Sequence, residues 1–110
     1  MKLIEAYIPP DALDQVRTLL RRRGIEDLVA SEMAIEVGEH DRLYWESDTA
    51  DFVSQIKVEL AVSDEQARST ARDIFNVVRP RRAKRRVQIL IGPLDDLVRI
   101  ETGERGAAAL

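Results

Sequence analysis

The stretch RPRRAKRR, from Arg79 to Arg86, holds six basic residues in eight positions. Guanidinium groups form paired hydrogen bonds with phosphate and carboxylate oxygens, so this stretch favours anion binding. The simpler alternative is a solvated connection at the end of a helix, where cations are favourable in any case. A nucleic-acid arm is a third option, but the aromatic residues that would stack on RNA bases beside such a patch are missing. We therefore expect an anion site and no nucleic-acid partner.

The remainder of the chain is acidic. Six of the 17 basic residues lie in 79–86 and three more in Arg21–Arg23, whereas 20 residues are acidic and the net charge is −3. A generally basic surface is therefore excluded, and any anion site is local. A second polar segment, VRIETGERG over 98–106, follows an apolar stretch. Composition alone assigns no role to this segment.

Catalytic and metal motifs are weak. The chain has no cysteine, which excludes disulfides, thiolate metal sites and a cysteine nucleophile. The single histidine, His40, stands between Glu39 and Asp41, without the paired spacing of a metal motif. The neighbouring Asp95 and Asp96 fit the start of a short helix better than an acid and base pair. We expect neither an enzyme nor a metal protein.

Length and hydrophobicity bound the architecture. A chain of 110 residues forms one domain, here 1–110, with a modest core of its own. The opening MKLIEAYIPP does not fit a secretory signal, and no apolar run approaches the roughly 20 residues needed to cross a bilayer. These features predict a cytoplasmic protein without direct membrane insertion.

The pattern of apolar residues predicts the order strand, helix, strand, strand, helix, strand. The expected elements are a strand over 1–8, a helix over 11–23 ended by Gly24, strands over 25–38, 52–62 and 87–92, a helix capped by Ser63 and Gln66, a short helix over 93–97 and a brief strand over 98–100. The buried stripe of the second long helix is expected to be Ala67, Ala71, Ile74, Phe75 and Val78.

This order predicts an α+β fold, a ferredoxin-like βαββαβ sandwich in which two helices cover one face of a four-stranded antiparallel sheet. The other face carries apolar residues and lies open in a single chain. Its simplest cover is another copy of the chain, so we expect a homo-oligomer.

Four segments carry a resemblance to a known family. MKLIEAYI, RRRGIEDLVASE, IKVELAV and above all VRIETGERG together resemble the PII signal-transduction family across nearly the whole chain. The chain looks like a divergent, short-loop member. The resemblance implies a homotrimer with inward-facing sheets, adenine nucleotides bound in clefts between subunits, and a mobile loop, here 38–51, that docks on a target protein. The C-terminal tail 101–110 is expected to line the cleft.

The resemblance also implies individual site residues. Arg99 matches an arginine that points at nucleotide phosphate, and Glu59 matches a glutamate near the adenine. The other positions carried over to the nucleotide or anion site are Val29, Gly38, Ala61, Lys84, Arg85, Arg86 and Gln88. The partner-binding loop contributes His40, Tyr44 and Trp45; one of the two adjacent aromatic residues is free to anchor a partner, or both pack on their own subunit.

Departures from the family pattern concern the phosphates. Glu101 replaces a second phosphate-facing arginine and would repel a triphosphate, and 79–86 contains no glycine for a backbone nest. The loop opens as Ile35–Glu39, without the glutamine that relatives use for magnesium and 2-oxoglutarate, and no modifiable tyrosine stands near Thr49. We therefore expect AMP or ADP, or a small anion such as bicarbonate, as the effector.

The sequence thus predicts a non-enzymatic regulator in nitrogen or carbon metabolism, acting on an unidentified transporter or enzyme. One alternative is a trimeric structural module that has lost nucleotide binding. Another is a metal-responsive ferredoxin-like trimer, for which His40 would be the ligand.

Overall fold

The computed structural model describes residues 1–36, 52–81 and 87–110. Its elements follow the predicted order. They are β1 (Lys2–Ile8), α1 (Leu13–Arg22), β2 (Val29–Glu36), β3 (Phe52–Val62), α2 (Asp64–Val78) and β4 (Gln88–Pro93), with 3-10 turns at Pro10–Ala12, Arg79–Arg81 and Gly106–Ala109. The predicted loop 38–51 and most of the basic stretch lie outside the described residues.

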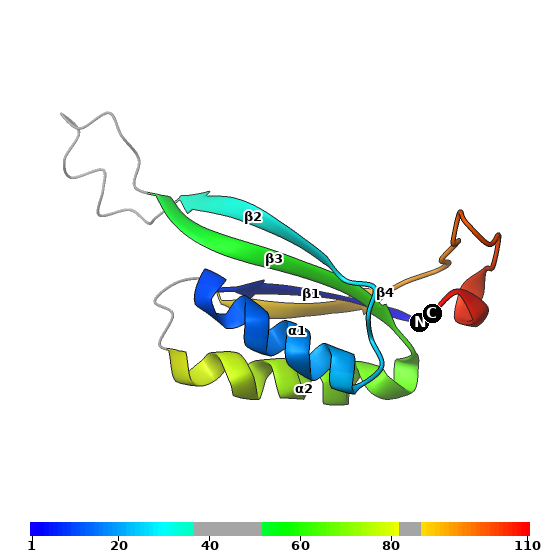
Figure 1. The fold of residues 1–110 in the computed structure, drawn as a ribbon, viewed down its shortest axis with the longest axis horizontal. Coiled ribbons are helices and arrows are strands. Elements are labelled where there is room, and N and C mark those ends of the chain that lie inside the picture. The colour runs from blue at the N-terminus through cyan, green and yellow to red at the C-terminus, as the bar shows by residue number, and fades with distance from the viewer. Residues whose placement is uncertain (37–51, 82–86) are drawn as a thin grey trace.

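The four strands form one antiparallel sheet in the order β2-β3-β1-β4. Both α-helices lie on the same side of this sheet, and the described residues leave its other side open (Figure 1). This arrangement confirms the predicted ferredoxin-like fold.

The core lies between the sheet and the helices. Alternate residues over 4–8 of β1 and 56–62 of β3 are buried there, as the predicted alternation requires: Ile4, Ala6 and Ile8 lie beside Ile56, Val58, Leu60 and Val62. The helices contribute Val16, Leu20 and Ile74. Because side chains alternate across a strand, the residues between these positions face the open side.

Local sequence signals set the end of α1 and the start of α2. Gly24 has a φ of 78° and its N–H donates to the Arg21 carbonyl at 2.9 Å, while the Ile25 N–H donates to Leu20 at 2.9 Å. This pair of bonds is a Schellman motif, which confirms Gly24 as the residue that ends α1. At the start of α2, the Ser63 hydroxyl accepts a bond from the Gln66 N–H at 3.4 Å.

Two predicted details of these elements are wrong: the buried stripe of α2 and the start of β2. Phe75 is 49% exposed, and Thr70 occupies the buried stripe with Ala67, Ala71 and Ile74. The predicted start of the second strand, at residue 25, is also too early, since β2 begins at Val29. Thr70 escaped the sequence-based prediction because it is polar, although its place at 67 + 3 lies on the same helical face.

The segment after β4 also differs from the prediction. Residues 94–97 are not helical, and the expected strand over 98–100 is reduced to an isolated bridge between Val98 and Arg105. Asp96 explains the first difference, because its side chain accepts the Leu97 N–H at 2.8 Å and thereby replaces a backbone turn.

The open face of the sheet mixes charge with apolar side chains. Lys57 Nζ lies 3.6 Å from Glu5 Oε2 and 3.5 Å from Glu59 Oε1. Desolvation favours the neutral amine of Lys57, but the negative charges of Glu5 and then Glu59 outweigh it and raise the pKa of this lysine. Leu90, opposite Glu5 on β4, is 47% exposed.

Neither α1 nor α2 is long and apolar enough to cross a membrane.

Candidate functional site

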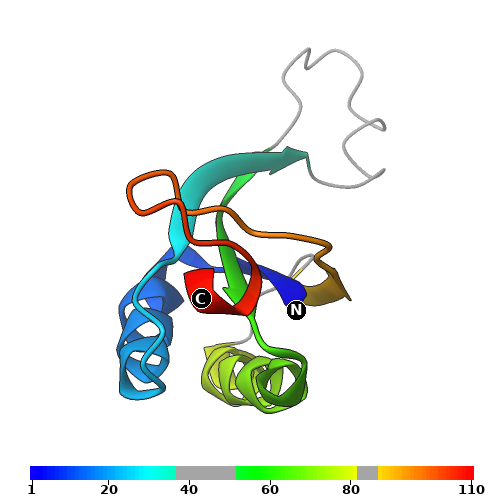
Figure 2. The ribbon, with the colours of Figure 1, turned by 90° about the vertical axis from the view of Figure 1, so that its right-hand side faces the viewer.

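A pocket of about 740 Å³ lies at the end of the sheet where β1 begins. Its walls come from the turn between α1 and β2, the C-terminal end of β3, and the C-terminal segment. Figure 2 looks onto this end of the molecule, with the C-terminal segment in orange and red in front of the sheet. Four of the predicted site residues line the pocket: Val29, Glu59, Ala61 and Arg99.

The sheet positions three of these residues. Val29 and Glu59 are direct partners in the β2–β3 ladder, and Ala61 stands two positions further along β3. All three therefore share the open face of the sheet. The side chains of Val29 and Ala61 give the pocket an apolar wall beside the carboxylate of Glu59.

The string TGERG positions the fourth residue. The Gly103 N–H donates to the Arg99 carbonyl at 2.7 Å and the Arg99 N–H donates to the Glu104 carbonyl at 2.9 Å, which closes a tight turn. Gly103 has a φ of 75°, a region that glycine enters without steric cost. The purpose of the polar string is thus structural as well as chemical: it folds back on itself and sets Arg99 at the pocket.

Arg99 already has two partners. Its Nη2 lies 2.5 Å from Asp27 Oδ2 and donates to the Ala109 carbonyl at 2.7 Å. The hydrogen bond and charge of Asp27, and then the charges of Glu101 and Glu104, raise the pKa of Arg99, so the guanidinium stays charged. The sequence analysis missed Asp27. Only its charge, directly after GIE, was a signal, and nothing linked it to an arginine 72 positions away.

The second arginine of the string has a separate role. Arg105 Nη2 lies 2.7 Å from Asp96 Oδ2, outside the set of residues that line the pocket. The hydrogen bond from Arg105, followed by that from the Leu97 N–H, lowers the pKa of Asp96. Asp96 therefore fastens the C-terminal turn and does not begin a helix, which corrects the prediction for Asp95 and Asp96.

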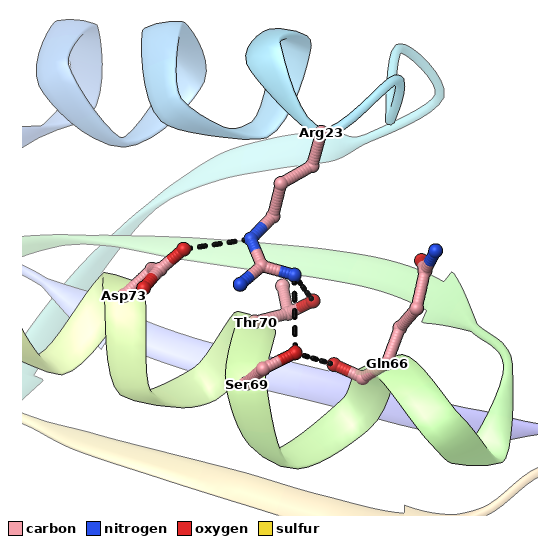
Figure 3. Close-up of polar contacts among 5 residues, drawn as sticks. All are labelled: Arg23, Gln66, Ser69, Thr70 and Asp73. Carbon is pink, nitrogen blue, oxygen red and sulfur yellow. Dashed lines mark hydrogen bonds and ion pairs between the residues drawn. The ribbon is translucent and has the colours of Figure 1, made fainter.

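A third arginine borders the pocket but is directed to the helices. Arg23 Nε lies 2.7 Å from Asp73 Oδ2, and its Nη1 donates to the hydroxyls of Ser69 and Thr70, each at 3.1 Å (Figure 3). The pocket lining therefore carries the acids Glu26, Asp27 and Glu59 and two arginines that are both paired with carboxylates. This lining has little free positive charge.

Gln88 lies elsewhere. It lines a second pocket, of about 470 Å³, between the end of β1, the C-terminal part of α2 and the start of β4. On β1, Tyr7 pairs with Gln88 of β4 and Glu5 pairs with Glu59 of β3. Gln88 and Glu59 are therefore two strands and two positions apart, which places their Cα atoms roughly 12 Å from each other. Within one protomer, Gln88 and Arg99 therefore line different pockets.

The second pocket is mostly apolar and carries one described residue of the basic stretch. The Arg79 guanidinium lies 5.6 Å from the centre of the Phe75 ring, a cation–π contact. Both residues line this pocket, together with Gln88. The start of the basic stretch therefore stands beside Gln88, at the opposite end of β1 from Arg99.

The other predicted positions lie outside the described residues: Gly38, Lys84, Arg85 and Arg86 of the anion site, and His40, Tyr44 and Trp45 of the partner loop. Within 1–36, 52–81 and 87–110, no three acidic or histidine side chains are grouped closely enough to hold a metal ion.

Comparison with known proteins gives a consistent result. The family model described as nitrogen regulatory protein P-II matches residues 1–104. The nitrogen regulatory protein P-II of Microchaete diplosiphon is 32% identical over 113 residues, and that of Rhizobium meliloti 32% over 114, each with both chains fully covered. The crystal structure of Arabidopsis thaliana PII bound to citrate superposes with a TM-score of 0.75 and 26% identity, covering 99% of this chain and 91% of the other.

Proposed function

Because the chain belongs to the family of nitrogen regulatory protein P-II, whose members are regulatory signal transducers and not enzymes, we propose that it senses an anionic effector. The effector is AMP or ADP by preference, or a small anion such as bicarbonate. It binds in clefts between the subunits of a homotrimer, and the bound state is passed to a partner protein.

The grouping of Val29, Glu59, Ala61 and Arg99 around one pocket is the observation that carries this proposal. Pockets of about 300–1,000 Å³ that combine apolar walls with a few polar groups are typical ligand sites. Val29 and Ala61 supply a wall for a flat base, Glu59 an acceptor for its amino group, and Arg99 a donor for phosphate.

The separation of Gln88 from Arg99 supports a site shared between protomers. A second protomer can bring its own Gln88 and the start of its basic stretch, at Arg79, to the pocket that holds Arg99 in the first. The open sheet face with Leu90 half exposed provides the surface for that contact. The citrate bound to Arabidopsis PII supports a small anion as a ligand of this architecture.

The loop 38–51, with His40, Tyr44 and Trp45, is the proposed contact with the target, a transporter or an enzyme. An effector can shift the loop between arrangements only by the difference between its affinities for them. The cytoplasmic location stays a prediction from the sequence.

A thermal-shift screen with AMP, ADP, ATP, cyclic AMP and bicarbonate tests the proposal. A ligand specific for the folded state stabilises it by about 2.7 kcal/mol at a hundred times its Kd, so AMP or ADP should raise the melting temperature with saturation. Arg99→Ala should abolish this rise. Arg22→Ala is the matched control, because it removes the same charge from an exposed position of α1 outside the pocket and leaves the turn that holds Arg99 intact.

A structural module that has lost its ligand is the second candidate, favoured by the acidic pocket lining and by the pairing of Arg99 with Asp27. It predicts that no nucleotide or bicarbonate stabilises the protein and that calorimetry records no heat of binding. For a metal-responsive trimer the described residues offer no supporting cluster, and His40 lies outside them.

A further inference from the structure

Asp27 competes with any ligand for Arg99. The Asp27 side chain is 71% exposed at the α1–β2 turn, yet its Oδ2 lies 2.5 Å from Arg99 Nη2, and both residues line the pocket. A phosphate oxygen that approaches this nitrogen meets a carboxylate already in place. The ion pair is therefore an internal substitute for a bound anion.

The geometry leaves part of the guanidinium free. Both contacts of Arg99, to Asp27 and to the Ala109 carbonyl, use Nη2. Nε and Nη1 have no hydrogen-bond partner within the part of the chain that the structure describes. Both two-donor edges of a guanidinium include Nη2, so no edge is open for two parallel hydrogen bonds while Asp27 stays in place. A single phosphate group can still take one hydrogen bond, from Nε or from Nη1, without displacing Asp27.

A longer phosphate chain meets more negative charge. Glu101 and Glu104 are close enough to Arg99 to raise its pKa, after the larger effect of Asp27. Glu26 and Glu59 line the same pocket. Each phosphate beyond the first brings more negative charge close to these carboxylates. Among the described residues of one protomer, two arginines line the pocket: Arg23 is bound to α2, and Arg99 already has Asp27 on its Nη2.

We propose that Asp27 is a specificity-determining residue that makes this cleft select a nucleoside monophosphate over a diphosphate or triphosphate. The inference rests on the proposed function and narrows its ligand class to AMP. Asp27 does so by occupying Nη2 of Arg99 with a negative charge, which leaves a single hydrogen bond for one phosphate group but repels the additional charge of a polyphosphate.

Isothermal titration of AMP, ADP and ATP against the wild-type protein and Asp27→Asn tests this, in magnesium-free buffer at constant ionic strength. Asparagine keeps the shape of the side chain and removes its charge. One unit charge at roughly 4 Å in water changes a binding constant about fivefold, and ATP carries about two charges more than AMP. The ratio of the ATP Kd to the AMP Kd should therefore fall at least about fivefold in Asp27→Asn.

Glu26→Gln is the matched control. It removes the same charge one residue away and from the same pocket lining, but leaves the contact between Asp27 and Arg99. Its ratio should change less than that of Asp27→Asn. An equal change in both variants would mean that overall charge, and not the ion pair, sets the preference, which would overturn the proposal.

The results separate this inference from the proposed function. If the wild-type protein binds AMP and the ratio is unchanged in Asp27→Asn, the function stands and the inference fails. If the wild-type protein binds no nucleotide but Asp27→Asn binds ATP, the proposed effector is wrong and the selection of a monophosphate is overturned with it, because Asp27 then excludes all three nucleotides. If neither protein binds any of the three nucleotides, both are overturned. Thermal melts confirm that each variant is folded.

Discussion

Arg23 Nε lies 2.7 Å from Asp73 Oδ2, and this pair ties the end of α1 to the middle of α2. The same guanidinium donates from Nη1 to the hydroxyls of Ser69 and Thr70, the latter fully buried. Arg23 directly precedes Gly24 and the turn that carries Asp27. These contacts of Arg23 therefore anchor the residue that comes just before the turn carrying Asp27.

Arg23→Ala should lower the free energy of unfolding by about 1–3 kcal/mol, because hydrogen bonds to charged groups contribute about this much and the Thr70 hydroxyl loses its donor. Urea denaturation followed by circular dichroism measures the change. Arg22→Ala is the control: its exposed side chain has no hydrogen bond or ion pair in the described residues. Equal stability of Arg23→Ala and wild type would show that the contacts are surface pairs of no energetic weight.

Gly24 and Gly92 form a matched pair for a backbone prediction. Neither has an atom within 4 Å of the place that a Cβ would occupy, but Gly24 alone of the two has a positive φ. Gly24→Ala should therefore destabilise by about 1–2 kcal/mol through conformational strain alone. Gly92→Ala should be neutral or slightly stabilising, since it restricts the unfolded chain. A similar loss in both variants, measured by chemical denaturation, would refute the Schellman argument.

Much of the fold could be predicted because its signals are local. The alternation in 52–62, Gly24 after α1 and Ser63 before α2 each act within a few residues, and the structure confirms all three. The resemblance of VRIETGERG to relatives located Arg99, which does line the pocket with Val29, Glu59 and Ala61.

The errors arise where tertiary contacts decide. Phe75 is apolar and lies beside the buried stripe, but the rotation of α2 against the sheet leaves it half exposed. The local sequence places Asp96 in a short helix because it gives no sign of the partner Arg105, nine positions later, which is reached only through a folded turn. The pairing of Asp27 with Arg99 joins two segments that no periodicity relates, so the acid that faces the key arginine was missed.

Asp96 should make the C-terminal turn sensitive to acid. Its folded pKa is lowered by Arg105 and by the Leu97 N–H, while an unfolded aspartate has a pKa of about 3.9. A lowered folded pKa contributes stability above the unfolded value, and this contribution is lost as the pH falls through the folded value. Asp96→Asn should thus reduce the melting temperature at pH 7, and this difference from wild type should shrink below about pH 4.

Asp95→Asn provides the comparison for that experiment, since it removes the same charge one residue away and keeps the contact between Asp96 and Arg105. Its difference from wild type should depend less on pH than that of Asp96→Asn. Melting curves from pH 2 to pH 7 that show the same profile for both variants would mean that the ion pair does not stabilise the folded chain.

The proposed trimer makes a prediction for β4, whose neighbouring residues Leu90 and Ile91 face opposite sides of the sheet. Leu90 is 47% exposed on the open face and Ile91 44% exposed on the helix side, opposite Ile4. Leu90→Lys places an ammonium group opposite Glu5, where the separate chain can pair it, but burial between subunits would cost several kcal/mol. Light scattering after size exclusion should show three chains for the wild type and one for Leu90→Lys.

Ile91→Lys introduces the same charge on the same strand at nearly the same exposure, and only the face differs. It should therefore remain trimeric, whatever its effect on stability. Dissociation of both variants would mean that the edge of β4, and not the open face, joins the subunits. A trimeric Leu90→Lys would place the interface away from this face altogether, and Gln88 of one protomer would then have no route to Arg99 of the next.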